Sequence, residues 1–145
     1  MIDPRPVAAA QAPSPFELDA FIVRLEGEFD VSERARLVDA FAVAATSAAV
    51  VIDFKRARYV DSSVLECLVA LQRALEKRGG SLLLVEIPSG IRRIFDVCGL
   101  DRFFSIRSTV GEVMSELDAD ATRVRRLTLI AEPTEAVEMD GSDLK

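Results

Sequence analysis

Hydrophobic and polar residues alternate over residues 21–27, so apolar side chains fall on one face and charged side chains on the other. A period of two residues predicts a half-buried strand, which ends at Gly27. Residues 48–52 and 82–85 are instead unbroken apolar runs, the pattern of strands covered on both faces. Residues 103–106 supply the last clear strand. The chain is therefore expected to build a sheet with buried central strands.

The segments between these strands carry apolar residues at helical spacing. Each predicted helix begins at polar residues that can cap it, and the second and third are followed by glycines suited to a C-cap. At the start of the last helix, Thr109 and Glu112 have the spacing of a capping box. The predicted helices cover residues 32–46, 61–78, 89–98 and 109–118.

The order of these elements indicates the fold class. Because helices separate the strands, the chain is predicted to have an α/β fold with a mostly parallel sheet and about four helices. Residues 16–18 can form a short first strand, with a turn at residues 19–20. This strand is expected to pair antiparallel with residues 21–27 as a hairpin, which would make the sheet mixed.

The two ends of the chain differ in composition from the middle. Residues 1–15 hold four prolines among small residues, which predicts a disordered arm. Residues 119–145 are predicted to be an acidic, flexible tail, in which residues 123–130 could add a short element. One folded domain is therefore expected over residues 16–118.

The chain is acidic, with a formal net charge of −6 and a pI of about 4.8, which argues against binding to nucleic acid or to an anionic membrane. It has no His, and its two cysteines, Cys67 and Cys98, lie far apart in apolar segments. No metal site is therefore expected. Both cysteines are predicted to be buried free thiols in a reducing compartment. Glycine-rich phosphate-binding motifs are absent, so no cofactor is expected. With neither a membrane-spanning stretch nor a secretion signal, the protein is predicted to be cytoplasmic.

Asp61, Ser62 and Ser63 stand where a predicted strand passes into a helix. One interpretation is structural: one of these side chains accepts a hydrogen bond from a free amide of the first helical turn. The other is regulatory, because a helix N-terminus tolerates added negative charge and phosphorylation here would change the surface without unfolding the domain. Asp30 and Asp53, with Asp61, lie near strand ends and could bind a cation, but solvated strand-end aspartates are far more common.

Four segments form an ordered set of motifs: LEGEFD at residues 25–30, VVIDF at 50–54, YVDSS at 59–63 and IRRIFDVCGLDRF at 91–103. Together they resemble the STAS domain in its bacterial anti-sigma factor antagonist form, over residues 16–118. The resemblance implies a STAS-like fold and a protein that is not an enzyme. Such a protein binds an anti-sigma factor serine kinase and so frees a sigma factor for transcription. The kinase phosphorylates the antagonist, and a serine phosphatase reverses this.

Carried over by position, the resemblance makes Ser62 the phosphoacceptor, with Ser63 as the second candidate, and Asp30 a neighbouring contact residue. The family usually reads Asp-Ser-Ser-Gly-Leu-Gly here, whereas Val64 and Glu66 replace the two glycines. Val64 could instead belong to the core. Glu66, four residues after Ser62, puts a carboxylate on the same helix face. The predicted partner-binding residues are Asp30, Asp61, Ser62, Ser63, Val64 and Glu66.

Two other functions fit the same residues. One is a constitutive docking or regulatory STAS subunit of a larger assembly, such as a transporter complex or a stress-signalling scaffold, in which Ser62 only caps the helix. The other is a sensor that binds a small ligand at the apolar sheet edge. Intact mass after incubation with the kinase and ATP separates the first of these from the antagonist, and ligand-induced thermal shifts would reveal the second.

Overall fold

One parallel sheet forms the frame of the protein. The computed structural model describes residues 18–117 and 122–132, so the arm predicted at residues 1–15 lies outside the described residues. The sheet has five strands in the order β4-β3-β2-β1-β5, and each neighbouring pair is parallel. The strands are β1 (Leu18–Phe29), β2 (Ala49–Val60), β3 (Ser81–Val85), β4 (Ser105–Arg107) and β5 (Thr122–Ala131).

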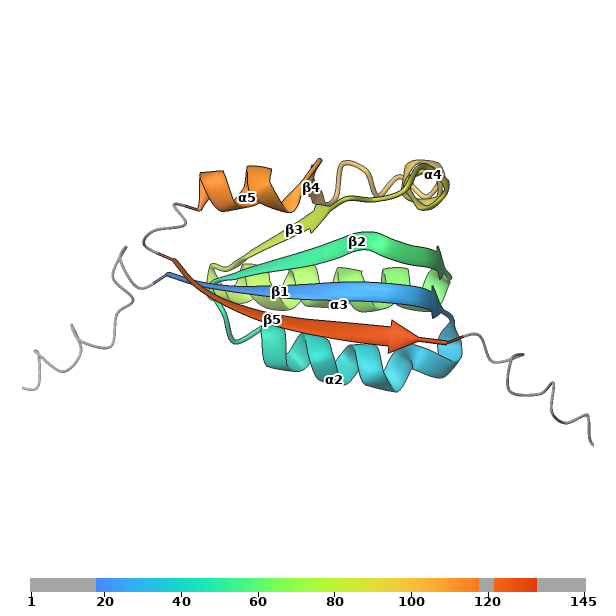
Figure 1. Ribbon diagram of the computed structural model, residues 1–145, viewed down its shortest axis with the longest axis horizontal. Helices are drawn as coiled ribbons and strands as arrows, with labels where there is room; N and C mark the ends of the chain where they lie inside the picture. Colours follow the sequence, from blue (N-terminus) through green and yellow to red (C-terminus); the bar gives the residue numbers. More distant parts are fainter. Residues whose placement is uncertain (1–17, 118–121, 133–145) are drawn as a thin grey trace, which may run out of the picture.

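Helices cover both faces of this sheet (Figure 1). They are η2 (Val31–Glu33), α2 (Arg34–Ala44), α3 (Ser62–Arg78), α4 (Ser89–Val97) and α5 (Val110–Glu116). On one face, α2 and α3 pack side by side and close the larger core, whose fully buried side chains include Phe29 and Phe54. On the other face, Val113 of α5 packs with Ile22 and Val51. The apolar runs of the central strands are buried because both of their faces are covered.

The predicted antiparallel N-terminal strand is wrong. Residues 18–29 form one continuous strand that pairs in parallel with both of its neighbours, β2 and β5. Asp19 and Ala20, expected at a turn, lie inside β1, where Ala20 is fully buried. The physical reason is that β5 occupies the place beside β1 that a hairpin strand would need, and Arg123 of β5 pairs with the Asp19 carboxylate at 3.5 Å.

Strand β5 lies in the region that the sequence assigns to the C-terminal tail, where residues 123–130 were a possible short element. It has ten residues and pairs with β1 along its whole length. Leu129 is buried, and Leu127 packs against the larger core. The alternation of apolar and polar residues is thus that of an edge strand with one face on the core.

The four predicted helices are present among the described residues, and two glycines end helices as expected. Gly79 and Gly99 have φ of +78° and +72°, in the left-handed region that glycine enters without a Cβ penalty. The Thr109 side chain accepts from the amide of Glu112 at 3.0 Å, which confirms the predicted cap. The start of the first helix differs from expectation, because the Asp30 carboxylate caps η2 and no side chain caps α2, whereas Ser32 was expected to supply the cap.

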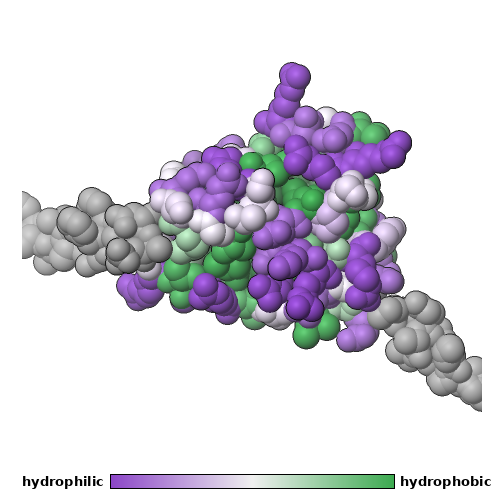
Figure 2. Space-filling model, turned by 45° about the horizontal axis from the view of Figure 1, so that its top comes forward, coloured by the Kyte–Doolittle hydropathy of each residue, from purple (hydrophilic) through white to green (hydrophobic). Residues whose placement is uncertain are grey.

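The two cysteines have different environments. Cys67 is buried in α3, as predicted. Cys98 is exposed, so the prediction of a buried thiol is wrong there. The reason is that α4 ends at Val97 and Cys98 is its C-cap residue, so the buried stripe of the helix does not include it. On the face drawn in Figure 2, hydrophilic side chains break up the hydrophobic areas.

Candidate functional site

The carboxyl ends of β1 and β2 lie side by side at the same end of the sheet (Figure 1), and an aspartate follows each strand in the sequence. Phe29 and Val60, the last residues of these strands, are paired in the ladder. The amide of Asp61 then donates to the Phe29 carbonyl oxygen at 3.2 Å. Asp30 and Asp61 therefore follow neighbouring strands at the same end of the sheet.

Asp61 is the N-cap of α3. Its side chain accepts from the amide of Ser63 at 2.9 Å, which satisfies a donor that the helix cannot pair. Ser62 is the first residue of the helix and is exposed, and its hydroxyl has no hydrogen-bond partner among the described residues. Asp61 therefore makes the capping hydrogen bond of this motif, and the Ser62 hydroxyl is not needed for it.

Asp30 performs the same task one strand away. Its carboxylate accepts from the amide of Ser32 at 2.9 Å and from the Ser32 hydroxyl at 2.5 Å, which fixes the start of η2. These hydrogen bonds, the hydroxyl bond first, hold the pKa of Asp30 below its ordinary value because they favour the charged form. The site thus presents two ordered carboxylates beside the exposed hydroxyl of Ser62.

The two residues that replace the family glycines lie in different environments. Val64 is fully buried and belongs to the larger core, which is the alternative that the sequence left open for it. Glu66 is exposed and accepts a hydrogen bond from the Arg34 guanidinium of α2 at 3.2 Å. Sequence reasoning missed Arg34, because only the tertiary packing of α2 against α3 brings it to this face.

A shallow apolar groove of about 200 Å³ begins at the Arg34–Glu66 ion pair and runs between α2 and α3. Val38 and Cys67 line it, together with small alanines of both helices. Val38 is half-exposed although it is a large apolar residue in a helix. The signal that could have found the groove is this valine, which lies off the buried stripe formed by Leu37 and Phe41. Burial raises the pKa of the Cys67 thiol, so it lines the groove as an apolar group.

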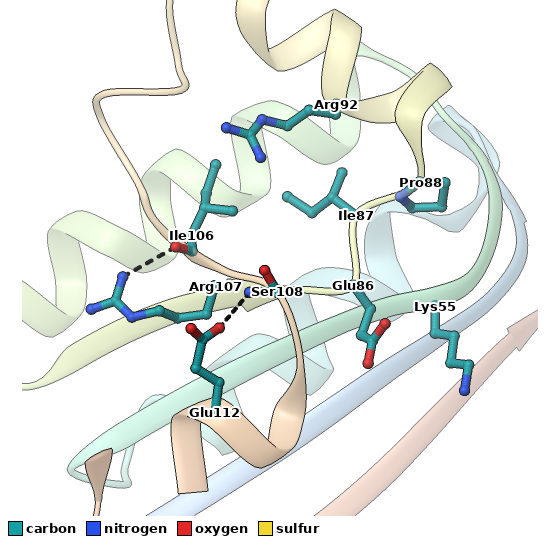
Figure 3. A pocket seen from close by; sticks show the side chains of 9 residues that line it. All are labelled: Lys55, Glu86, Ile87, Pro88, Arg92, Ile106, Arg107, Ser108 and Glu112. Atoms are coloured by element: carbon teal, nitrogen blue, oxygen red, sulfur yellow. Dashed lines mark hydrogen bonds between the residues drawn. The ribbon is translucent and has the colours of Figure 1, made fainter. Parts of the chain in front are cut away.

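A larger hollow of about 600 Å³ lies elsewhere, at the carboxyl ends of β3 and β4 (Figure 3). Several of its charged groups already have partners. Arg107 pairs with Glu116 at 2.6 Å, Arg92 pairs with Asp96 at 3.5 Å, and Glu112 accepts from the amide of Ser108 at 2.7 Å. The Arg107–Glu116 pair joins β4 to α5, whereas the Arg92–Asp96 pair lies within α4.

The strand-end aspartates do not form a cation site together. Asp53 is buried and pairs with Arg24 at 3.3 Å, on the face of the sheet opposite α2 and α3. Within residues 18–117 and 122–132, no group of three or more Cys, Asp or Glu side chains could hold a metal ion. In the same residues, the structure contains no helix with the length and apolar character needed to cross a membrane.

A family model described as "Mlab, STAS domain" matches residues 14–111. The chain belongs to the STAS domain family. Its fold is similar to that of SpoIIAA, the Bacillus cell fate determinant, in its phosphorylated form, with 23% identity and a TM-score of 0.53 over 66% of this chain and 88% of that one. SpoIIAA is an anti-sigma factor antagonist.

Two further STAS-like structures have the same fold. A putative anti-sigma factor antagonist from Thermotoga maritima is 18% identical, with a TM-score of 0.57 over 64% of this chain and 82% of that one. A sulfate transporter family protein from Wolinella succinogenes is 16% identical, with a TM-score of 0.60 over 81% of this chain and 97% of that one. The STAS fold is thus shared by antagonists and by transporter proteins.

Proposed function

We propose that this STAS protein is an anti-sigma factor antagonist that binds an anti-sigma factor serine kinase and is switched off by phosphorylation at Ser62. The observation that carries the proposal is the exposed hydroxyl of Ser62, which has no hydrogen-bond partner in the part of the chain that the structure describes and stands at the start of a helix that Asp61 caps. Because the capping bond does not involve Ser62, a phosphoryl group can be added there without loss of the cap. Similarity of fold to an antagonist solved in a phosphorylated form supports the same conclusion.

The proposed step is an ordinary phosphoryl transfer. The Ser62 oxygen forms a bond to the γ-phosphorus of ATP, the bond from that phosphorus to the bridging oxygen breaks, ADP leaves with the electron pair, and the hydroxyl proton is released. The product carries about −1.5 to −2 charges near pH 7. The N-terminus of α3 tolerates this charge, because the helix dipole is positive there.

The surroundings of Ser62 give the switch its physical effect. Glu66 lies on the same helix face as Ser62, and the ion pair with Glu66 brings Arg34 to that face. A phosphoryl group on Ser62 repels the carboxylates of Asp61 and Glu66 and competes with Glu66 for Arg34. A partner that docks on the neutral hydroxyl and the adjoining groove then meets an altered charge pattern, which weakens binding.

The test compares two serines that each begin a helix. Ser62→Asp is expected to keep the fold, measured by circular dichroism, and to weaken binding to the cognate anti-sigma factor kinase in a titration. Ser89→Asp is the matched control, since Ser89 is the exposed first residue of α4. Intact mass and phosphopeptide mapping after incubation with the kinase and ATP should place one phosphate on Ser62. A phosphate found on Ser63 alone would move the switch by one residue.

A second function is a constitutive docking subunit of a larger assembly, such as a transporter complex. The similarity in fold to a sulfate transporter family protein favours it. In that case Ser62 contacts the partner but is never phosphorylated. Incubation with the kinase and ATP then adds no mass to the protein. Ser62→Ala and Ser62→Asp then have the same affinity for an anti-sigma factor as the wild-type chain, or neither shows measurable binding.

A further inference from the structure

The second half of β2 has a neighbouring strand on one side only. β3 pairs with residues 49–53, whereas β1 pairs with β2 as far as Val60, so residues 54–60 have no partner strand on the β3 side within the described sheet. Part of their backbone faces away from β1, because amides and carbonyls of a strand point alternately to its two sides. Outside the ladder with β1, the described residues show one backbone hydrogen bond here, from the Lys55 amide to the Asp53 carboxylate at 2.9 Å. The rest of this edge can pair with another extended segment.

A groove of about 490 Å³ runs along this edge, between β2 and α4. In Figure 1, α4 lies beside the end of β2 that extends beyond β3. Ala57 and Tyr59 line the groove from β2, and Ile91 and Ile94 line it from α4. Tyr59 is 48% exposed, so a large aromatic ring is only half covered there. The volume falls in the range of natural ligand pockets, and the apolar lining can receive side chains of a bound segment.

The exposed charged side chains on this half of β2 are basic. Lys55, Arg56 and Arg58 are exposed, and none of them has an ion-pair partner in the part of the chain that the structure describes. Glu86 lines the adjoining hollow together with Lys55, but the two side chains form no ion pair (Figure 3). The chain as a whole has a net charge of −6, so this positive charge is local. It attracts carboxylates and repels the same edge of a second copy.

We propose that the groove between β2 and α4 binds an extended acidic segment of a partner protein, whose backbone pairs with the open edge of β2. The edge supplies hydrogen-bonding groups, the groove receives apolar side chains, and the basic side chains select carboxylates. Charged residues also protect strand edges from self-pairing, but protection alone predicts that no peptide binds. The proposal does not rest on the proposed function, because the groove is lined by none of the residues of the Ser62 site.

The test measures binding of a labelled synthetic peptide of alternating glutamate and valine to the full chain, by fluorescence anisotropy at low salt. Saturable binding is expected. Arg58→Glu should weaken it about fivefold or more, because an attractive charge becomes a repulsive one. Arg73→Glu is the matched control, since Arg73 is exposed in α3, away from the groove, and the change in net charge is the same. Circular dichroism checks that both variants are folded.

Two further peptides test the backbone pairing without changing any charge. One is N-methylated on the valines and the other on the glutamates. Only one alternate set of amides faces the partner strand in β-pairing, so one of these peptides should lose binding and the other should keep it. Equal affinity of both methylated peptides would overturn the pairing, even if the peptide binds by charge.

Hydrogen exchange locates the bound peptide. Backbone amides within residues 55–60 are expected to exchange more slowly when the peptide is present, while those of residues 34–45, beside the groove between α2 and α3, stay unchanged. The proposal is overturned by the absence of saturable binding, by equal affinities of Arg58→Glu and Arg73→Glu, or by protection of residues 34–45 instead. None of these measurements involves the kinase or phosphorylation of Ser62, so this proposal and the proposed function can fail separately.

Discussion

The burial of Val64 can be tested by comparing it with a valine on the surface of the neighbouring helix. Val64→Ala removes two carbons from a side chain that is 0% exposed. Each buried carbon contributes about 0.8 kcal/mol, the cavity adds to the loss, and the better helix propensity of alanine returns about 0.6 kcal/mol. The free energy of unfolding should therefore fall by roughly 2 kcal/mol.

Val38→Ala in α2 is the control, because Val38 is 47% exposed and also lies inside a helix. There the smaller loss of burial and the gain in helix propensity nearly cancel, so the expected change is within about 0.5 kcal/mol of zero. Urea unfolding followed by circular dichroism measures both variants under the same conditions. Equal losses in the two variants would refute the placement of Val64 in the core. If the placement is right, restoring glycine at Val64 opens the core, and the effect of the altered motif on the kinase is better tested with Glu66→Gln.

Three further predictions concern other parts of the molecule. Asp30→Asn should lower the urea midpoint of unfolding near neutral pH, and the difference from wild type should vanish in acid. The folded pKa of Asp30 lies below its ordinary value of 3.8, so the stabilisation by the charged carboxylate is present above that value and is lost as the pH falls through the folded pKa. A thiol reagent should titrate Cys98 in the native protein and reach Cys67 only after unfolding, and rapid modification of both would contradict the burial of α3. Gly27→Ala should destabilise the protein by about 2 kcal/mol or more, because φ is +105° at residue 27 and a Cβ would collide with the carbonyl of Ala131. Thermal unfolding measures this loss. If the substitution has no effect, β5 can move away from β1.

The parts of the fold that follow from local patterns were predictable. Helix α3 begins at a polar cluster and ends at Gly79, and the structure confirms both ends. The position of Asp61 and Ser62 at a helix start was predictable for the same reason, since a strand-to-helix junction is visible in a few consecutive residues. Which of the two caps the helix needed the structure, because either side chain has an oxygen at a suitable distance along the chain.

The features that the sequence did not reveal depend on contacts between distant segments. Nothing local distinguishes an antiparallel hairpin at residues 16–27 from one long strand paired with β5. The same holds for the Arg34–Glu66 ion pair, which exists because α2 and α3 pack together. The exposure of Cys98 was mispredicted because the apolar stripe of α4 was extended one residue too far.

The position of β1 between β2 and β5 has a consequence for the way the protein is made. Leu18 pairs with Thr122, so one neighbour of this strand is among the last described residues to leave the ribosome. Until then, Phe21, Val23 and Leu25 belong to a strand that can pair on one side only. Long-range parallel pairing is slow to form and leaves such an edge open to other nascent chains. We therefore expect that ribosome-bound chains ending before residue 122 engage chaperones, and that release of β5 completes the domain.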